Sequence, residues 1–188
     1  MAARPLIEIV ESDPGWPDEF AAIEEVLSGA LGALALRIDH IGSTSVPALA
    51  AKDIIDVQVT VAALSHGVVG ALVDAGFVFR EDLDRDLLTG CDEPDEMRKL
   101  VFVERPGERR ANVHVREQGR RNQRYALLFR DHLRADAEIR DAYAELKRVL
   151  AREYRDDPER YYDVKDPVMD IIYRGAEQWA AATGWEQG

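Results

Sequence analysis

The chain has 188 residues, 46% hydrophobic and 32% charged, with a formal net charge of −12; this balance is typical of a globular domain, and the acidity disfavours general nucleic-acid binding and binding to anionic membranes. The lone cysteine, Cys91, excludes an internal disulfide framework and disfavours a cysteine-based zinc site. No stretch reaches the roughly 18 apolar residues of a membrane span, and the N-terminal residues lack a signal-peptide pattern, so we expect a cytoplasmic protein.

The first third of the sequence predicts a strand, a helix and a second strand. We expect one domain over residues 1–188, because no repeat or low-complexity linker interrupts the sequence. A short strand is predicted at 6–10, and a helix follows with Pro17 at its first position, where proline is tolerated. A second strand at 36–41 then stops at Gly42.

Residues 54–61 carry the clearest alternation of apolar and polar side chains in the chain. The apolar set is Ile55, Val57, Val59 and Val61. The alternate positions carry the polar residues Asp56, Gln58 and Thr60, together with one apolar residue, Ile54. Because successive side chains of a strand point to opposite faces, this pattern predicts a strand with one packed face and one face toward a cleft.

The remaining sequence predicts three more strands and four helices. The helices are expected at 63–75, 121–134, 136–154 and 167–182, the last two with Asp136 and Asp166 as N-caps. The strands are expected at 77–80, 98–104 and 110–116, and an acidic loop at 81–96. Asn112, His114 and Arg116 share one face of the last strand. This order predicts an α+β fold, a mixed β-sheet with helices packed mainly on one face.

The segment from His40 to Thr60 carries the residues best suited to chemistry. Glycine at position 42 lets the backbone approach a ligand closely, and the hydroxyl residues Ser43, Thr44 and Ser45 follow it. Their hydroxyls and N–H groups can form an anion-binding nest. The next strand exposes Asp56, whose carboxylate can hold Mg²⁺ beside a phosphate bound at the turn.

An apolar residue followed by Gly-Ser and then by an acidic strand is typical of the nucleotidyltransferase superfamily. Within it, His40-Ile-Gly-Ser-Thr-Ser-Val-Pro, Ala-Lys52 and Ile-Ile-Asp56 resemble the GrpB-like family. Further matching segments are Asp13-Pro-x-Trp16-Pro17, His114-Val, Phe129-Arg-Asp-His-Leu133, Tyr143-x-x-Leu-Lys147, Lys165 and Trp179. The resemblance spans nearly the whole chain and implies a nucleotidyltransferase-like sheet and a nucleotide ligand.

Three positions depart from the family pattern. Ala48 stands where the family usually has glycine, and Asp53 stands where it usually has proline. Gln58 occupies the position of the second acid of active nucleotidyltransferases. An amide adds no negative charge, which argues against a two-metal mechanism. Asp53 is no simple replacement, because it lies before the strand or on the face opposite Asp56.

These patterns define the candidate site. Asp56 is the expected metal ligand and, with His114, a candidate catalytic residue; His114 would act as an acid or base, or as a polar substitute for a third acid. The candidate phosphate- or ligand-binding residues are Gly42, Ser43, Thr44, Ser45, Lys52, Gln58, Asn112, Arg116, Arg124 and Lys165. The arginines of residues 109–124 are either a solvated rim paired with acids or a phosphate clamp; Arg116 and Arg124 are preferred for the clamp.

Two functional hypotheses remain open. The first is a nucleotidyltransferase-like protein that binds a nucleotide or another small phosphorylated molecule with Mg²⁺ at the Gly42-Ser43 turn and Asp56. The second is a non-catalytic nucleotide- or anion-binding module that keeps the fold but lacks the full set of acids. Gln58 favours the second hypothesis, and a third, purely structural role leaves the Gly-Ser-Thr-Ser turn unexplained.

Overall fold

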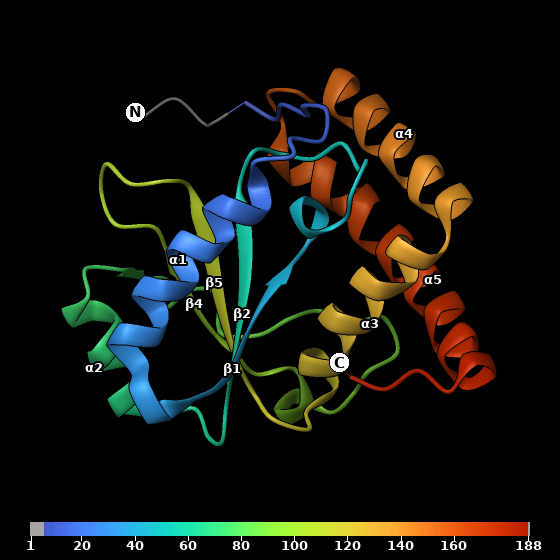
Figure 1. Cartoon of the computed structure of the whole chain (residues 1–188). Coiled ribbons are helices and arrows are strands. Elements are labelled where there is room, and N and C mark those ends of the chain that lie inside the picture. The colour runs from blue at the N-terminus through green and yellow to red at the C-terminus, as the bar shows by residue number, and fades with distance from the viewer. Residues whose placement is uncertain (1–5, 188) are drawn as a thin grey trace.

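A mixed five-stranded sheet in the order β1-β2-β5-β4-β3 forms the centre of the computed structural model, which describes residues 6–187 (Figure 1). The strands are β1 (Ala35–Ile41), β2 (Ile55–Val61), β3 (Val78–Phe79), β4 (Leu100–Val103) and β5 (Ala111–Glu117). Strands β2 and β5 are parallel, and every other neighbouring pair is antiparallel. The expected α+β class and mixed sheet are confirmed.

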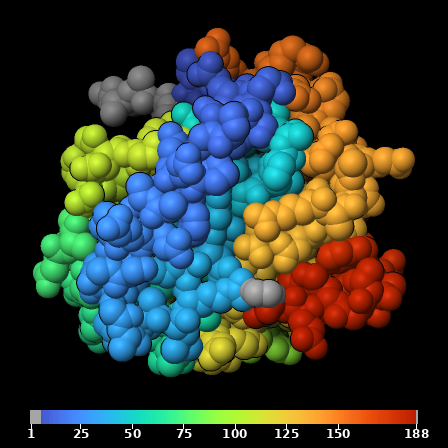
Figure 2. Space-filling model, in the orientation of Figure 1, coloured from blue at the N-terminus to red at the C-terminus, as the bar shows by residue number. Residues whose placement is uncertain are grey.

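The helices divide between the two faces of the sheet. They are α1 (Trp16–Leu31), α2 (His66–Asp74), α3 (Arg121–Ala135), α4 (Ala137–Glu153) and α5 (Pro158–Thr183). Helices α1 and α2 lie on one face, whereas α3 contacts β1, β2 and β5 and packs in turn against α4 and α5 (Figure 1). In the view of Figure 2, a light-blue to cyan strip separates the blue α1 from the orange and red C-terminal helices; by the colour bar, this strip belongs to residues around 40–60.

Strand β2 lies where the alternation of residues 54–61 predicts a strand. Val57 and Val59 are fully buried and belong to one apolar core with Trp16 and Leu27 of α1. The polar side chain of Gln58 is buried as well, because α3 covers that face of the strand. Among the polar residues of β2, Asp56 lines a cleft, whereas Gln58 and Thr60 do not.

The strand predicted at residues 6–10 is wrong. Only Val10 pairs with another segment, in an isolated bridge to Ala51, and the N–H of Ile7 donates to the carbonyl of Arg155 at 2.8 Å. This segment lacks a neighbouring strand, so its apolar side chains pack individually instead of extending the sheet.

The start predicted for the last helix, at Asp166, is also wrong. Helix α5 begins at Pro158, and the Asp157 side chain caps it by accepting from the N–H of Arg160 at 3.2 Å. Pro167 lies inside the helix, where it removes one backbone donor. The predicted N-cap at Asp136 is confirmed, because its carboxylate accepts from Glu138 and Ile139 at 3.0 Å each.

Within residues 6–187, no helix is both long enough and apolar enough to cross a membrane. A short 3₁₀ turn, η2 (Ser43–Ser45), follows β1, and two others are η1 (Gly32–Leu34) and η3 (Pro94–Met97). The η2 turn brings the hydroxyl residues next to the polar end of β2, where the candidate site lies.

Candidate functional site

The turn after β1 and the polar face of β2 meet at one point. Ile41 pairs with Asp56 across the antiparallel β1–β2 ladder, so the residue after Ile41 lies beside the carboxylate. That residue, Gly42, has φ +67°, and a Cβ placed on it would lie 2.4 Å from Asp56 Oδ2. Only glycine fits there without moving the carboxylate. The structure thus brings the two main elements predicted from the sequence into contact.

Two polar residues of β5 hold the other oxygen of Asp56. Asn112 Nδ2 donates to Asp56 Oδ1 at 2.8 Å, and His114 Nε2 lies 3.9 Å from the same oxygen. Burial raises the pKa of Asp56, but the neighbouring His114 and Asn112 outweigh this effect and lower the pKa below its ordinary value. Burial lowers the pKa of His114, so Asp56 is ionised and His114 neutral near pH 7.

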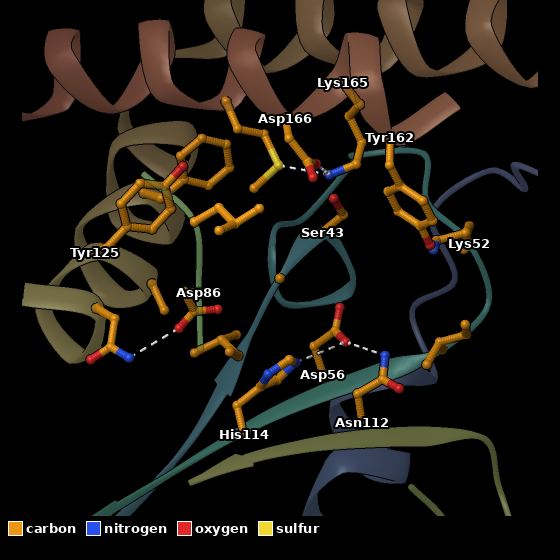
Figure 3. A pocket seen from close by; sticks show the side chains of 18 of the residues that line it. Ser43, Lys52, Asp56, Asp86, Asn112, His114, Tyr125, Tyr162, Lys165 and Asp166 are labelled. Carbon is orange, nitrogen blue, oxygen red and sulfur yellow. Dashed lines mark hydrogen bonds and ion pairs between the residues drawn. The ribbon is translucent and has the colours of Figure 1, made fainter. Parts of the chain in front are cut away.

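A cleft of about 460 Å³ opens over Gly42 and Asp56, between the sheet and helices α3, α4 and α5. In Figure 3, Asp56, Asn112 and His114 project from the strands, Ser43 lies across from them on the turn, and Lys52, Tyr162 and Lys165 lie beyond it. Tyr125 and Phe129 of α3 also line this cleft.

Three lysines from three segments line the end of the cleft near Ser43. Lys147 of α4 donates to Ser43 Oγ at 2.9 Å. Lys52 contacts the hydroxyl of Tyr162 and lies 4.7 Å from its ring centre. Lys165 is paired with Asp166 at 2.6 Å. In a chain with a net charge of −12, this is a local concentration of positive charge suited to an anion.

Lys147 was not predicted as a site residue, although it belongs to the Tyr143-x-x-Leu-Lys147 segment. It is only 3% exposed. Its signal in the sequence is a lysine on the apolar face of a helix, at helical spacing from Tyr143 and Leu150, which are both buried. A charged residue on the packed side of a helix is rare unless it is paired or functional.

Asp86 is the second residue that the sequence analysis missed. It lies in the long loop before β4 and forms two hydrogen bonds with Arg116, at 2.9 and 3.1 Å, and one with Lys99 at 2.6 Å. Arg116 lines the cleft as expected, but its guanidinium is already occupied by Asp86 and by Gln58 Oε1 at 2.8 Å. Both charges of this pair are therefore satisfied within the protein.

The structure places three predicted residues away from a ligand in the cleft. Gln58 is fully buried, with its amide donating to the carbonyl of Gln123 at 3.1 Å and its oxygen accepting from Arg116. The Ser45 hydroxyl donates to the carbonyl of Gly42 at 2.6 Å. Arg124 pairs with Glu177 of α5 at 3.2 Å. None of these three residues lines the cleft, and their assignment as ligand-binding residues stays a prediction.

Thr44 and His40 form a structural pair next to the turn. Their side chains are 3.0 Å apart, and His40 stacks on Phe20 of α1 at 4.8 Å between ring centres. Burial lowers the pKa of His40 to about 4, so the ring is neutral near pH 7. Thr44 still lines the cleft, whereas His40 supports the turn from the opposite face of the sheet, as its alternation with Ile38 indicates.

The donor set around Asp56 suits one metal ion shared with a ligand rather than two held by the protein. Within residues 6–187, no cluster of three or more His, Cys, Asp or Glu side chains could hold a metal ion. Asp56 Oδ2 faces the turn, while Oδ1 is engaged by Asn112. Mg²⁺ is commonly held by one or two carboxylates together with the oxygens of a substrate phosphate, which is the arrangement that this site could form.

A family model described as "GrpB protein" matches residues 6–174 of the chain. The chain belongs to the GrpB family. A UPF0157 protein of Streptomyces coelicolor is 37% identical to this GrpB-family chain over 168 residues, covering 88% of the chain and 82% of the relative. A solved structure of the conserved protein GrpB from Enterococcus faecalis matches with a TM-score of 0.74 and 28% identity, over 92% of this chain and 99% of that one.

Longer relatives also contain a GrpB-like region. A protein of Mycolicibacterium paratuberculosis named dephospho-CoA kinase is 36% identical over 202 residues, which cover 98% of this chain and 49% of the relative. The chain spans about half the length of these curated relatives. It contains no Gly-x-x-x-x-Gly-Lys-[Ser/Thr] segment, the phosphate loop of a P-loop kinase.

Proposed function

We propose that this GrpB-family chain binds a nucleotide, or another small phosphorylated molecule, in the cleft over Asp56. The ligand's phosphate binds at the Gly42-Ser43 turn, and Mg²⁺ is shared between that phosphate and Asp56. The observation that carries the proposal is the contact between Gly42 and Asp56 Oδ2, because it joins an anion-binding turn to an ionised carboxylate in one cavity.

The surroundings of Ser43 supply the groups that a phosphate needs. Ser43 Oγ accepts from the Lys147 ammonium, so the hydroxyl hydrogen of Ser43 is left to donate to a phosphate oxygen. Lys52 and Lys165 add two further ammonium groups on the same side of the cleft. Charge-assisted hydrogen bonds of this kind are about twice as strong as neutral ones.

The other side of the cleft suits the organic part of such a ligand. Tyr125 and Phe129 provide aromatic surface, and Met169 provides apolar surface. Pockets for small molecules typically combine a mostly apolar lining with a few convergent polar groups. A phosphate near Ser43 would place the rest of a nucleotide over the aromatic side chains of Tyr125 and Phe129.

Transfer of a nucleotidyl group and simple binding are the two forms that this function could take. Bound Mg²⁺ would offset the charge of the phosphate in an in-line displacement, and Asp56 would hold it. Within residues 6–187, the buried Gln58 and the neutral Asn112 leave Asp56 as the single carboxylate at the turn. This shortage of acids favours the binding module, while His114, 3.9 Å from Asp56, is the candidate acid or base for a reaction.

Isothermal titration calorimetry with ATP, GTP, CTP and UTP, each with Mg²⁺, tests the proposal. Dephospho-CoA and coenzyme A belong in the same panel, because longer relatives of the chain carry the name dephospho-CoA kinase. We expect at least one compound to bind, and Asp56→Asn to weaken that binding. Asp74→Asn, an exposed change on α2, is the matched control. Binding to no compound, or equal binding by Asp56→Asn, contradicts the proposal.

Release of pyrophosphate separates the two forms. If the chain transfers a nucleotidyl group, a nucleotide that binds in calorimetry yields pyrophosphate when candidate acceptors are added, and Asp56→Asn abolishes the release. If the chain is a binding module, the same nucleotide binds together with Mg²⁺ and no pyrophosphate appears.

A further inference from the structure

Lys147 is a buried cation without an anionic partner. Its ammonium donates to the neutral hydroxyl of Ser43 and lies 4.7 Å from the ring centre of Tyr143. Within the part of the chain that the structure describes, no Asp or Glu forms an ion pair with it, although it is only 3% exposed. Buried charges in proteins are normally paired or bound to ligands, so this ammonium requires an explanation.

The charges that surround Lys147 do not supply a counter-ion. Lys165 on α5, Lys52 on the segment before β2 and Arg148 on its own helix are cations that lower the pKa of Lys147, and Asp56 on β2 is a carboxylate that raises it. Lys165 is neutralised by Asp166 and Arg148 by Glu11, whereas Asp56 is engaged by Asn112 and His114. Burial therefore outweighs the attraction of Asp56, and the surroundings oppose a charged Lys147 in the free protein.

We infer that Lys147 couples ligand binding to the uptake of a proton. The phosphate of the ligand supplies the counter-ion that the Lys147 ammonium lacks. The cleft therefore binds the phosphate together with one proton, which Lys147 takes up. This inference rests on the proposed function and adds a pH-dependent control of the same site. The proton joins the Lys147 amine, and no covalent bond of the ligand is broken.

The ionisation of the free side chain agrees with this geometry. The pKa of Lys147 is lowered from 10.5 to about 7, mainly by burial and also by Lys165, Arg148 and Lys52, against the opposing effect of Asp56. A bound phosphate adds negative charge beside Ser43 Oγ and raises the pKa again. Between the free and the bound pKa, binding takes up close to one proton, and affinity falls about tenfold for each unit of rising pH.

The first measurement follows Lys147 itself. The Cε resonances of ¹³C-labelled lysine, assigned with Lys147→Met, report the titration in the free protein and with sodium sulfate, whose charge is constant across this pH range. We expect Lys147 to titrate near neutral pH in the free protein and at least one unit higher with sulfate. An ordinary titration in the free protein, or one that sulfate and Mg-ATP both leave unchanged, overturns the inference.

The second measurement is calorimetry with Mg-ATP near pH 8, where the phosphates are already ionised, in buffers that differ in ionisation enthalpy. The wild type is expected to take up close to one proton and to lose about tenfold in affinity for one unit of rising pH. Lys147→Arg, which stays charged at every pH, and Lys147→Met lose this pH dependence. Lys52→Met binds more weakly but keeps it, because Lys147 is intact.

The outcomes separate this inference from the proposed function. Binding of Mg-ATP that depends on Asp56 but takes up no proton overturns the role of Lys147 alone. Absence of binding by Mg-ATP and by every other compound of the panel overturns the proposed function and this inference with it. Proton uptake that persists in Lys147→Met assigns the coupling to another group and also contradicts the inference.

Discussion

Replacing Lys147 with methionine should make the folded protein more stable at neutral pH, although the change removes a residue of the candidate site. Methionine has a similar length and fills the same space, but it carries no charge. The wild type must bury an ammonium with no ion-pair partner within residues 6–187, and removal of an uncompensated buried charge is stabilising.

The lowered pKa of Lys147 sets the size of the expected change in the unfolding free energy. Its pKa is about 7 in the folded protein and 10.5 ordinarily, so between these values the unfolded chain binds more protons than the folded one and stability rises with pH. At about pH 7 the penalty is roughly 4 kcal/mol, and it falls by roughly 3 kcal/mol by about pH 9.5. Methionine loses the Ser43 hydrogen bond and the Tyr143 contact, worth about 1 kcal/mol each.

The net prediction is that Lys147→Met stabilises the fold by roughly 2 kcal/mol at neutral pH and destabilises it slightly above about pH 9. Urea unfolding of both proteins at a series of pH values measures the difference, in which the titration of all other groups cancels to a first approximation. Lys52→Met is the control, because Lys52 is less buried. A stability difference between wild type and Lys147→Met that does not change with pH would refute the reasoning.

Three further substitutions have defined outcomes. Gly42→Ala puts a Cβ 2.4 Å from Asp56 Oδ2 on a residue with φ +67°. It should lower the unfolding free energy by at least about 1–2 kcal/mol and abolish nucleotide binding in calorimetry. Unchanged binding contradicts the role of the turn. Gln58→Glu puts a carboxylate against the Gln123 carbonyl, so urea unfolding should show a loss of about 1–3 kcal/mol in the unfolding free energy. We expect no gain in Mg²⁺ affinity; a gain would show that position 58 can reach the metal. Ala48→Gly relieves the positive φ of 64° of Ala48 and should raise the unfolding free energy by up to about 1 kcal/mol; a loss would mean that the Ala48 backbone is unstrained.

The convergence of Gly42 and Asp56 could be predicted from the sequence because it depends on local rules. The alternation of residues 54–61 fixes the face of Asp56, and the end of β1 at Ile41 fixes the position of the turn. Two antiparallel neighbours then bring these points together. The polar face of β5 could be predicted in the same way, and it supplies Asn112 and His114.

The contribution of the C-terminal helices could not be read from local patterns. Lys147 meets Ser43 across 104 positions of sequence, and this contact depends on how α4 packs beside α3 and α5. The partner of Arg116 comes from the acidic loop, where Asp86 is one of many similar residues. Asp166 suggested a helix start because aspartate is a common N-cap, but the helix begins after the cap at Asp157 and continues through Asp166 and Pro167.

The departures from the family pattern have different structural consequences. Ala48 keeps a backbone conformation that favours glycine, at φ 64°. Asp53 accepts from the indole of Trp16 at 2.9 Å and pairs with Arg109, so it stabilises the start of α1 and does not supplement Asp56. Gln58 is built into the contact between β2 and α3.

A crystal structure of the protein with ATP and Mn²⁺ tests the central claim most directly, because anomalous scattering locates the metal. The account predicts phosphate density within hydrogen-bond distance of Ser43 Oγ and Lys147 Nζ, and one Mn²⁺ bridging that phosphate to Asp56 Oδ2. Nucleotide density elsewhere on the protein, or phosphate at the turn with no metal at Asp56 under saturating Mn²⁺, would contradict it.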